Sequence, residues 1–436
     1  MSSISSALNA AVSGLQAEGA AITAVSENIA NANTTAYKTA SVNFQELVTG
    51  SGINASGGVL YSNTSNVGVA GQITSTATDT NIAINGQGFF VVSGNLTNKP
   101  SAYTYSRNGT FSTDKSGYLV NNEGFYLLGQ ATNSAGAVTA ANQNDINSLA
   151  PINVNAIKGA AKPTANITEK INLPADATTS GSFQSSAEVF DSLGVSNTVV
   201  QTWTKTASNA WTLSLANPVL TSNSSGSATG TIAPNNFQIV FNGDGSLQSI
   251  KSTTAGVTTN WTTPPVVAIT GWTTGANASS IALDLGTIGA TDGLTQFSSN
   301  TSTPALTISS VTGDGLRFGN LSSLSIDDSG LVTAGFDNGL KQPIDQIPIA
   351  TFPNPDGLTH ISGSVYAISS NAGNYVLQQP NQGSAGSIVA SAVEESTTDT
   401  STEFNKLIVA QQAYSAAAQI ISTVKSLYDT LQQAVR

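Results

Sequence analysis

The sequence predicts a mainly β chain whose two ends come together as a terminal α-helical coiled coil. Apolar residues recur at heptad spacing near both termini. The long stretch between them alternates apolar and polar residues and turns at glycines, which is typical of strands. The composition also shifts twice inside that stretch. We therefore expect a nested, multi-domain fold, with a helical domain built from both termini, a β domain built from both flanks and an inserted outer β domain.

The first helix is expected to end near residues 31–33, where asparagines tolerate left-handed backbone. Its apolar residues follow alternating steps of four and three, the spacing of a coiled-coil seam, with Glu18 as the one polar interruption. The apolar members of this seam are Ile4, Leu8, Ala11, Leu15, Ile22, Val25 and Ile29.

The last stretch of the chain repeats this spacing after an N-cap predicted at Ser401 or Thr402. Its seam contains Phe404, Leu407, Gln411, Tyr414, Ala418 and Ile421 and, after one shift, Val424, Tyr428, Leu431 and Val435. One such helix laid on one other buries little more than is needed to offset the entropy of ordering it. We expect both ends to be poorly ordered in an isolated subunit and to be completed by neighbouring subunits. An intramolecular two-helix stalk is the alternative.

The β stretch begins near Val69 and reads as consecutive hairpins with turns at Asn108-Gly109, Ser116-Gly117 and Glu123-Gly124. Glycine and small polar residues before it predict a pliable or weakly ordered connector. The predicted division is a terminal helical domain at 1–36 and 394–436, a connector at 37–70, a middle β domain at 71–160 and 311–393, and an inserted outer β domain at 161–310.

Charged residues are scarce, which limits the classes of partner. They make up 9% of the chain, against a usual value of about 25%. A surface of uncharged polar residues loses little when it is buried against a copy of itself, and this favours a subunit of an assembly. The net charge of −11 argues against a nucleic-acid partner. We find no apolar run of transmembrane length and no positively charged signal-peptide start, so neither membrane insertion nor a cleaved leader is expected.

No catalytic or cofactor constellation is visible in the sequence. Cysteine is absent, and the single histidine, His360, has no nearby carboxylate cluster. Asp244 and the Asp327-Asp328 pair lie in glycine-containing turns, where turn chemistry accounts for them. We therefore predict no enzyme activity, no cofactor and no metal.

The chain resembles the axial proteins of the bacterial flagellum, the family of rod and hook subunits. The stretch "SGLQAEGAAITAVSENIANANTTAYK" is similar to the family's N-terminal signature. "INGQGFFVV", "YSRNGTF" and "GYLVNNEGFYLLG" are similar to its β hairpins, and "FNKLIVAQQAYSAAAQIISTVKSLYDTL" to its C-terminal helix. The commoner form has glycine where this chain has Ala36, which predicts a less left-handed turn. The signature residues carried over are Gly14, Leu15, Asn28, Ile29, Ala30, Asn31, Thr34, Tyr37 and Lys38.

Within this family, the chain length and the large insert favour a hook subunit. A hook-filament junction protein or a distal rod protein is the alternative. The resemblance implies polymerisation into a curved, flexible helical tube that passes torque from rod to filament. It also implies contacts with rod, hook-cap and junction proteins, and passage through the flagellar export apparatus to an extracellular site. The implied assembly surface is the two helical seams.

A different class of function is a secreted β-rich adhesin. Such a protein would bind glycans through exposed aromatic side chains, and Trp203 and Trp211 are the candidates for that role.

Overall fold

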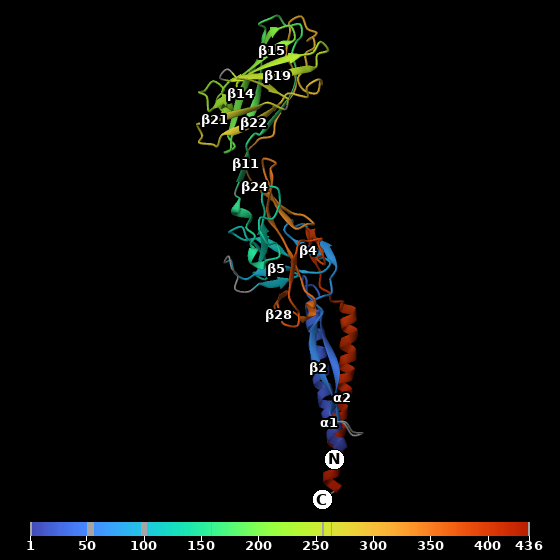
Figure 1. Cartoon of the computed structure of the whole chain (residues 1–436). Coiled ribbons are helices and arrows are strands. Elements are labelled where there is room, and N and C mark those ends of the chain that lie inside the picture. Colours follow the sequence, from blue (N-terminus) through green and yellow to red (C-terminus); the bar gives the residue numbers. More distant parts are fainter. Residues whose placement is uncertain are drawn as a thin grey trace. The chain divides into compact units, whose positions relative to one another are not determined.

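The computed structural model describes residues 2–49, 56–96, 103–157, 159–254, 257–262 and 264–434. It contains two compact units, each continuous in space but not in sequence (Figure 1). Unit 1 comprises Met1–Ala156, Leu324–Ala334 and Gln342–Arg436, and unit 2 comprises Ile157–Ser323 and Gly335–Lys341. Both ends of the chain thus belong to unit 1. The finer division of unit 1 into a helical and a β domain stays a prediction.

Two long helices stand at the ends of the chain, α1 over Ser2–Ala30 and α2 over Thr400–Ala434. The carboxylate of Asp399 accepts the backbone N–H groups of Ser401, at 2.8 Å, and Thr402, at 3.1 Å. Asp399 is therefore the N-cap, and the prediction of Ser401 or Thr402 is wrong. An ionised carboxylate satisfies the free N–H groups of the first turn and suits the positive end of the helix dipole.

The expected connector is instead a regular β-hairpin of strands β1 (Ala40–Thr49) and β2 (Ser56–Ser65), paired antiparallel with Ala40 opposite Ser65. The prediction of weak order is therefore wrong over these strands. Their small residues serve close packing on α1. Ser13 Oγ accepts the N–H of Val59 at 3.0 Å, and a Cβ at Gly58 would lie 3.1 Å from that same oxygen.

The rest of unit 1 is a body of short strands in which β26, β9, β5, β6, β29 and β28 are neighbours in that order. Its core is aromatic, and Phe352 packs edge-on against Tyr105 and Phe89. The predicted hairpin turns at Gly117 and Gly124 are found, both with positive φ. The strands are β3 Ile73–Ser75, β4 Ile82–Asn85, β5 Phe89–Ser93, β6 Thr104–Ser106, β7 Phe111–Thr113, β8 Leu119–Asn121, β9 Tyr126–Ala131, β10 Ala150–Pro151, β25 Leu331–Phe336, β26 Lys341–Gln346, β27 Ile349–Thr351, β28 Thr359–Ser362, β29 Val365–Ala367, β30 Val376–Gln378, β31 Ser387–Ala390 and β32 Ala392–Glu394.

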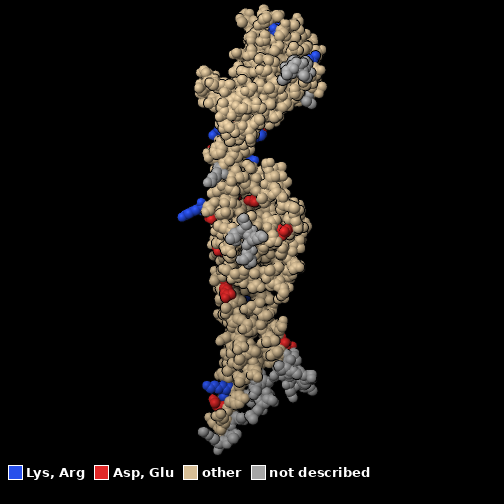
Figure 2. Space-filling model, turned by 60° about the vertical axis from the view of Figure 1, so that its left-hand side comes forward, with Lys and Arg blue, Asp and Glu red and all other residues tan. Residues whose placement is uncertain are grey.

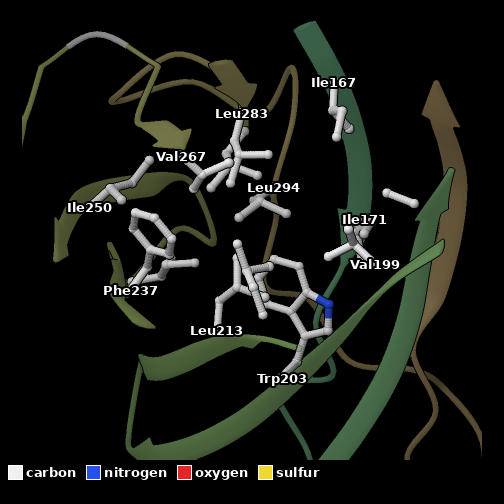
Figure 3. Close-up of a cluster of buried hydrophobic side chains, with 14 of the residues drawn as sticks. Ile167, Ile171, Val199, Trp203, Leu213, Phe237, Ile250, Val267, Leu283 and Leu294 are labelled. Carbon is white, nitrogen blue, oxygen red and sulfur yellow. The ribbon is translucent and has the colours of Figure 1, made fainter. Parts of the chain in front are cut away.

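Unit 2 has two main sheets that share one hydrophobic core (Figure 3). One sheet has the order β13-β14-β15-β18-β19-β20 and the other β17-β21-β22-β12-β23. Inward residues alternate with outward ones along β14, as expected for a half-buried strand. The strands are β11 Gly159–Lys162, β12 Asn166–Asn172, β13 Ser182–Phe190, β14 Ser196–Ala207, β15 Ala210–Leu215, β16 Val219–Leu220, β17 Thr231–Ala233, β18 Asn236–Phe241, β19 Leu247–Thr254, β20 Val257–Trp261, β21 Val266–Thr270, β22 Ser279–Asp284, β23 Thr307–Gly313 and β24 Leu316–Ile326. The division between the units falls inside three strands: residues 324–326 of β24 belong to unit 1, and residues 335–336 of β25 and 341 of β26 belong to unit 2. The predicted fold class, mainly β with helices at both ends, is confirmed.

Candidate assembly surface

The two terminal helices pack against each other within the single chain, as in the intramolecular alternative (Figure 1). Four alanines of the helices are buried, Ala11, Ala17 and Ala24 of α1 and Ala410 of α2, together with Val25 and Val424. Alanine faces allow two helices to approach closely, because little side-chain volume separates their backbones. Most of the larger seam residues are only half-buried or exposed.

The predicted seam of α1 is mostly half-buried in this arrangement. Ala11 and Val25 are buried, whereas Leu8, Leu15, Ile22 and Ile29 are only half-buried. The side chain of Ile4 lies outside the described residues.

The predicted seam of α2 is split between the inside and the outside of the chain. Val424 is buried and the half-buried members are Leu407, Ile421 and Tyr428. Phe404 and Tyr414 point outward and are 53% and 44% exposed. The side chain of Leu431 and the whole of Val435 lie outside the described residues.

A second apolar stripe on α2 was not predicted. Val409, Ile420 and Leu427 are 65%, 46% and 56% exposed. Steps of eleven and seven residues place them on one flank of the helix. Sequence reasoning missed this stripe because it assigned only one seam to each helix, although the spacing was there to be read.

The β1–β2 hairpin adds further exposed apolar surface next to the helices. Phe44 and Tyr61 are direct cross-strand partners on one face of the hairpin, and both are exposed. Leu60 is also exposed, on the opposite face.

Asn28 of the predicted signature joins three elements of unit 1. Its buried amide donates to Ala40 O at 2.8 Å and to Glu403 Oε2 at 3.0 Å. Its carbonyl oxygen accepts the N–H of Ala40 at 2.9 Å and the hydroxyl of Tyr37 at 3.1 Å. All four hydrogen-bonding positions of the amide are used, so α1, β1 and α2 are held in one fixed arrangement.

Asn31 and Thr34 close the end of α1. Asn31 Nδ2 donates to the carbonyl of Glu27 at 2.9 Å, and the hydroxyl of Thr34 donates to Asn31 Oδ1 at 3.1 Å. Ala36 has φ 59°, so the prediction of a less left-handed turn is wrong. Its N–H donates to the carbonyl oxygen of Glu394 at 2.8 Å, and this contact with the distant strand β32 holds the left-handed backbone.

Lys38 of the signature belongs to a buried ionic cluster with Glu394 and Arg107. Lys38 Nζ lies 2.5 Å from Glu394 Oε1, and Arg107 Nη1 lies 3.3 Å from Glu394 Oε2. Glu394 Oε1 also accepts the N–H of Gly71 at 2.6 Å. Burial lowers the pKa of Lys38, and the Glu394 carboxylate opposes that shift. The cluster ties the start of the chain to its end and to the β body of unit 1.

The two tryptophans and the histidine that the sequence analysis singled out differ in their exposure. Trp203 (Figure 3) and Trp211 are fully buried in unit 2, so the glycan-binding role proposed for exposed indoles is wrong. His360 is exposed and its Nε2 donates to the carbonyl of Gly363 at 2.7 Å. Across the described ranges, His, Asp and Glu do not gather in groups of three or more that could hold a metal ion. Neither described helix combines the length and hydropathy that a membrane crossing requires.

Four family descriptions match successive parts of the chain. The flagellar basal body rod protein description matches residues 8–38, and the flagellar hook protein FlgE/F/G D1 domain matches residues 83–186. The flagellar basal body protein FlaE D2 domain matches residues 153–309, and the C-terminal description of flagellar basal body rod FlgEFG proteins matches residues 389–434.

Three relatives that align over nearly the whole chain are each described as flagellar hook protein FlgE. The Brucella abortus protein is 30% identical, over 96% of this chain and 96% of its own length. The Caulobacter vibrioides protein is 28% identical, over 98% and 99%, and the Salmonella typhimurium protein is 29% identical, over 97% and 98%. A crystal structure of Helicobacter pylori hook protein FlgE2 aligns with 72% of this chain and 98% of its own, at 14% identity and a TM-score of 0.46.

Proposed function

The chain belongs to the family of flagellar hook protein FlgE, and we propose that its terminal helices form the surface through which these hook subunits join into a tube. The proposed surface comprises the outward members of the two predicted seams, the second stripe on α2 and the apolar face of the β1–β2 hairpin. Hook subunits are structural, so the surface binds other subunits and carries no reaction.

The exposed side of α2 carries this proposal. Six large side chains are each at least 44% exposed along this helix: Phe404, Ile408, Val409, Tyr414, Ile420 and Leu427. Burying a side chain of this size contributes about 1.5–3 kcal/mol. A second copy that covered this helix would therefore gain far more from its apolar side chains than from charged ones, because α2 has only four charged residues, Glu403, Lys406, Lys425 and Asp429, within Thr400–Ala434.

The low density of charge over the rest of the chain suits a joint that bends while it transmits torque. Figure 2 shows a face on which Lys, Arg, Asp and Glu are few and scattered. Neighbouring surfaces of this kind break few ion pairs when they shift against each other. We propose a curved, flexible tube with the helices inside and the β units outside.

We also propose specific partners, which membership of this family suggests. They are the rod at one end of the hook, the hook cap during growth, the junction proteins that meet the filament and the flagellar export apparatus. In this proposal the chain reaches the hook by that apparatus.

Replacement of one outward side chain tests the role of α2. Phe404→Asp should leave the subunit folded, because that side chain is 53% exposed. It should prevent the purified protein from forming curved tubes in negative-stain electron microscopy, because a carboxylate would then be buried between subunits. Leu193→Asp is the control, since Leu193 is 54% exposed but lies in unit 2. Normal tubes from the folded Phe404→Asp variant would refute the proposal.

A further inference from the structure

Glu18, the one charged member of the α1 seam, lies in the wall of an apolar groove. The groove has a volume of about 510 Å³ and runs between α1, α2 and the start of β1. Its apolar lining is contributed by Ala21, Ala24, Val42, Phe44, Val409 and Ala410.

The carboxylate of Glu18 makes no ion pair with any described residue of its own chain. Glu403 and Lys406 also line the groove, but they pair with each other at 2.7 Å. Partial burial raises the pKa of Glu18, and desolvation is the cause. If a second subunit covered this groove, Glu18 would lose its remaining water and would need a cation.

Helix α2 has one lysine that could meet this need. Besides Lys406, the only cation on the described parts of the two helices is Lys425. Lys425 follows Gln411 and Ala418 at steps of seven, so it lies on the same exposed flank of α2 as these two residues, although the predicted seam itself resumes one residue earlier, at Val424. It makes no ion pair with a described residue, including Asp429 one turn further along.

Glu18 and Lys425 are far apart within one chain. Lys406 is the α2 cation that shares the groove with Glu18, and Lys425 lies nineteen residues further along the helix. At 1.5 Å per residue, that separation is about 28 Å. The two charges can meet only if α2 of another copy is displaced along the groove by about this distance.

We propose that Glu18 of one subunit pairs with Lys425 of a second copy of this chain, and that this pair fixes the axial register between the two copies. The inference rests on the proposed assembly role of the helices and adds a specific contact to it. A slip of one helical turn would place Glu18 opposite Asp429 in place of Lys425. Apolar seams tolerate such slips, whereas a single buried charge pair favours one register and opposes the next.

Charge reversal in the full-length protein tests the pair, with the critical concentration for tube formation as the readout. Glu18→Lys and Lys425→Glu should each raise that concentration at least about tenfold, because each leaves like charges facing across the contact. The double variant should return to within roughly threefold of the original protein, because the pair is restored with its signs exchanged. Glu27→Lys, a reversal on the exposed side of α1, is the matched control and should change little.

The outcomes separate this inference from the proposed function. If the original protein forms no tubes, the proposed function is refuted, and so is the Glu18–Lys425 contact that rests on it. If tubes form and either single reversal leaves the critical concentration unchanged, only the pair is refuted. A double variant that is no better than the worse single variant also refutes it.

Cross-linking gives a second and independent measurement. The chain has no cysteine, so Glu18→Cys with Lys425→Cys supplies the only two thiols. A short bis-maleimide reagent added to tubes of this variant should give a ladder of covalent oligomers, because each chain contacts one copy through each thiol. Tubes that give only uncross-linked or internally linked monomers would overturn the proposal.

Discussion

Replacing Glu394 by glutamine should destabilise unit 1 and leave unit 2 unchanged. The carboxylate of Glu394 is fully buried and is the anion that faces both Lys38, at 2.5 Å, and Arg107, at 3.3 Å. Glutamine keeps the volume and one carbonyl oxygen but removes the charge. Two buried cations would then lack a counter-ion, and breaking a buried ion pair in this way costs about 3–5 kcal/mol.

The two units can be followed by separate signals in one urea titration. The four tryptophans, Trp203, Trp211, Trp261 and Trp272, all lie in unit 2, and both long helices lie in unit 1. Tryptophan fluorescence therefore reports unit 2, and the helical far-UV circular dichroism reports unit 1. We expect Glu394→Gln to lower the free energy of unfolding of unit 1 by about 3–5 kcal/mol and to leave the fluorescence transition in place.

The pH dependence of the variant supplies a further check on the cause. Without Glu394, burial still lowers the pKa of Lys38 below 10.5, and the carboxylate no longer opposes the shift. The unfolded chain then binds more protons than the folded one below that pH, so stability rises as the pH rises. The difference in the free energy of unfolding between the variant and the original protein should therefore become smaller as the pH approaches 10.5.

Lys162→Met is the matched control for loss of a pair. The Lys162–Asp314 pair is partly exposed at the surface of unit 2, with 3.2 Å between Nζ and Oδ2. Its loss should cost less than about 1 kcal/mol. The reasoning is refuted if Glu394→Gln costs no more than this control, or if it shifts the fluorescence transition as much as the dichroism transition.

Two further predictions concern buried polar groups, one in each unit. Burial raises the pKa of Glu169 from 4.5 to about 7, against the opposing hydrogen bond from Gln201. The folded state therefore binds more protons between these values, and unit 2 should lose about 3 kcal/mol of stability as the pH rises through this window. Glu169→Gln should remove that slope in fluorescence-monitored urea titrations, and an unchanged slope would contradict the assignment. Asn28→Asp should cost unit 1 at least about 2 kcal/mol at neutral pH, because two donated hydrogen bonds are lost and a carboxylate faces Glu403. Dichroism-monitored unfolding should show this cost shrinking in acid, whereas a cost that did not depend on pH would exclude repulsion as its cause.

The sequence by itself predicted the kinds of element and much of their order. Heptad spacing located both helices, because a helix of 3.6 residues per turn places apolar residues at a regular spacing of three and four positions in the sequence. Glycines at positions such as Gly117 and Gly124 located hairpin turns, because a positive φ favours that residue type. The N-cap was missed by only two residues, since Asp399 competes with the Ser and Thr that follow it.

The tertiary structure decided which faces of these elements meet. Local periodicity defines a seam but not its partner, so it could not reveal that Ala17, Ala24 and Ala410 are buried while Phe404 and Tyr414 stay exposed. The order of β1 and β2 depends on pairing between the two strands and on close contact with Ser13. Composition alone records neither.

The ion pair made by the signature lysine, Lys38, joins two residues that are far apart in the sequence. Lys38 and Glu394 are separated by 356 positions, and neither has a local pattern that points to the other. They pair because both ends of the chain belong to one unit. The fold thereby brings the cation near the start of the chain next to the anion near its end. Because burial makes each charge costly without the other, the contact is strong in the folded state and invisible in the sequence.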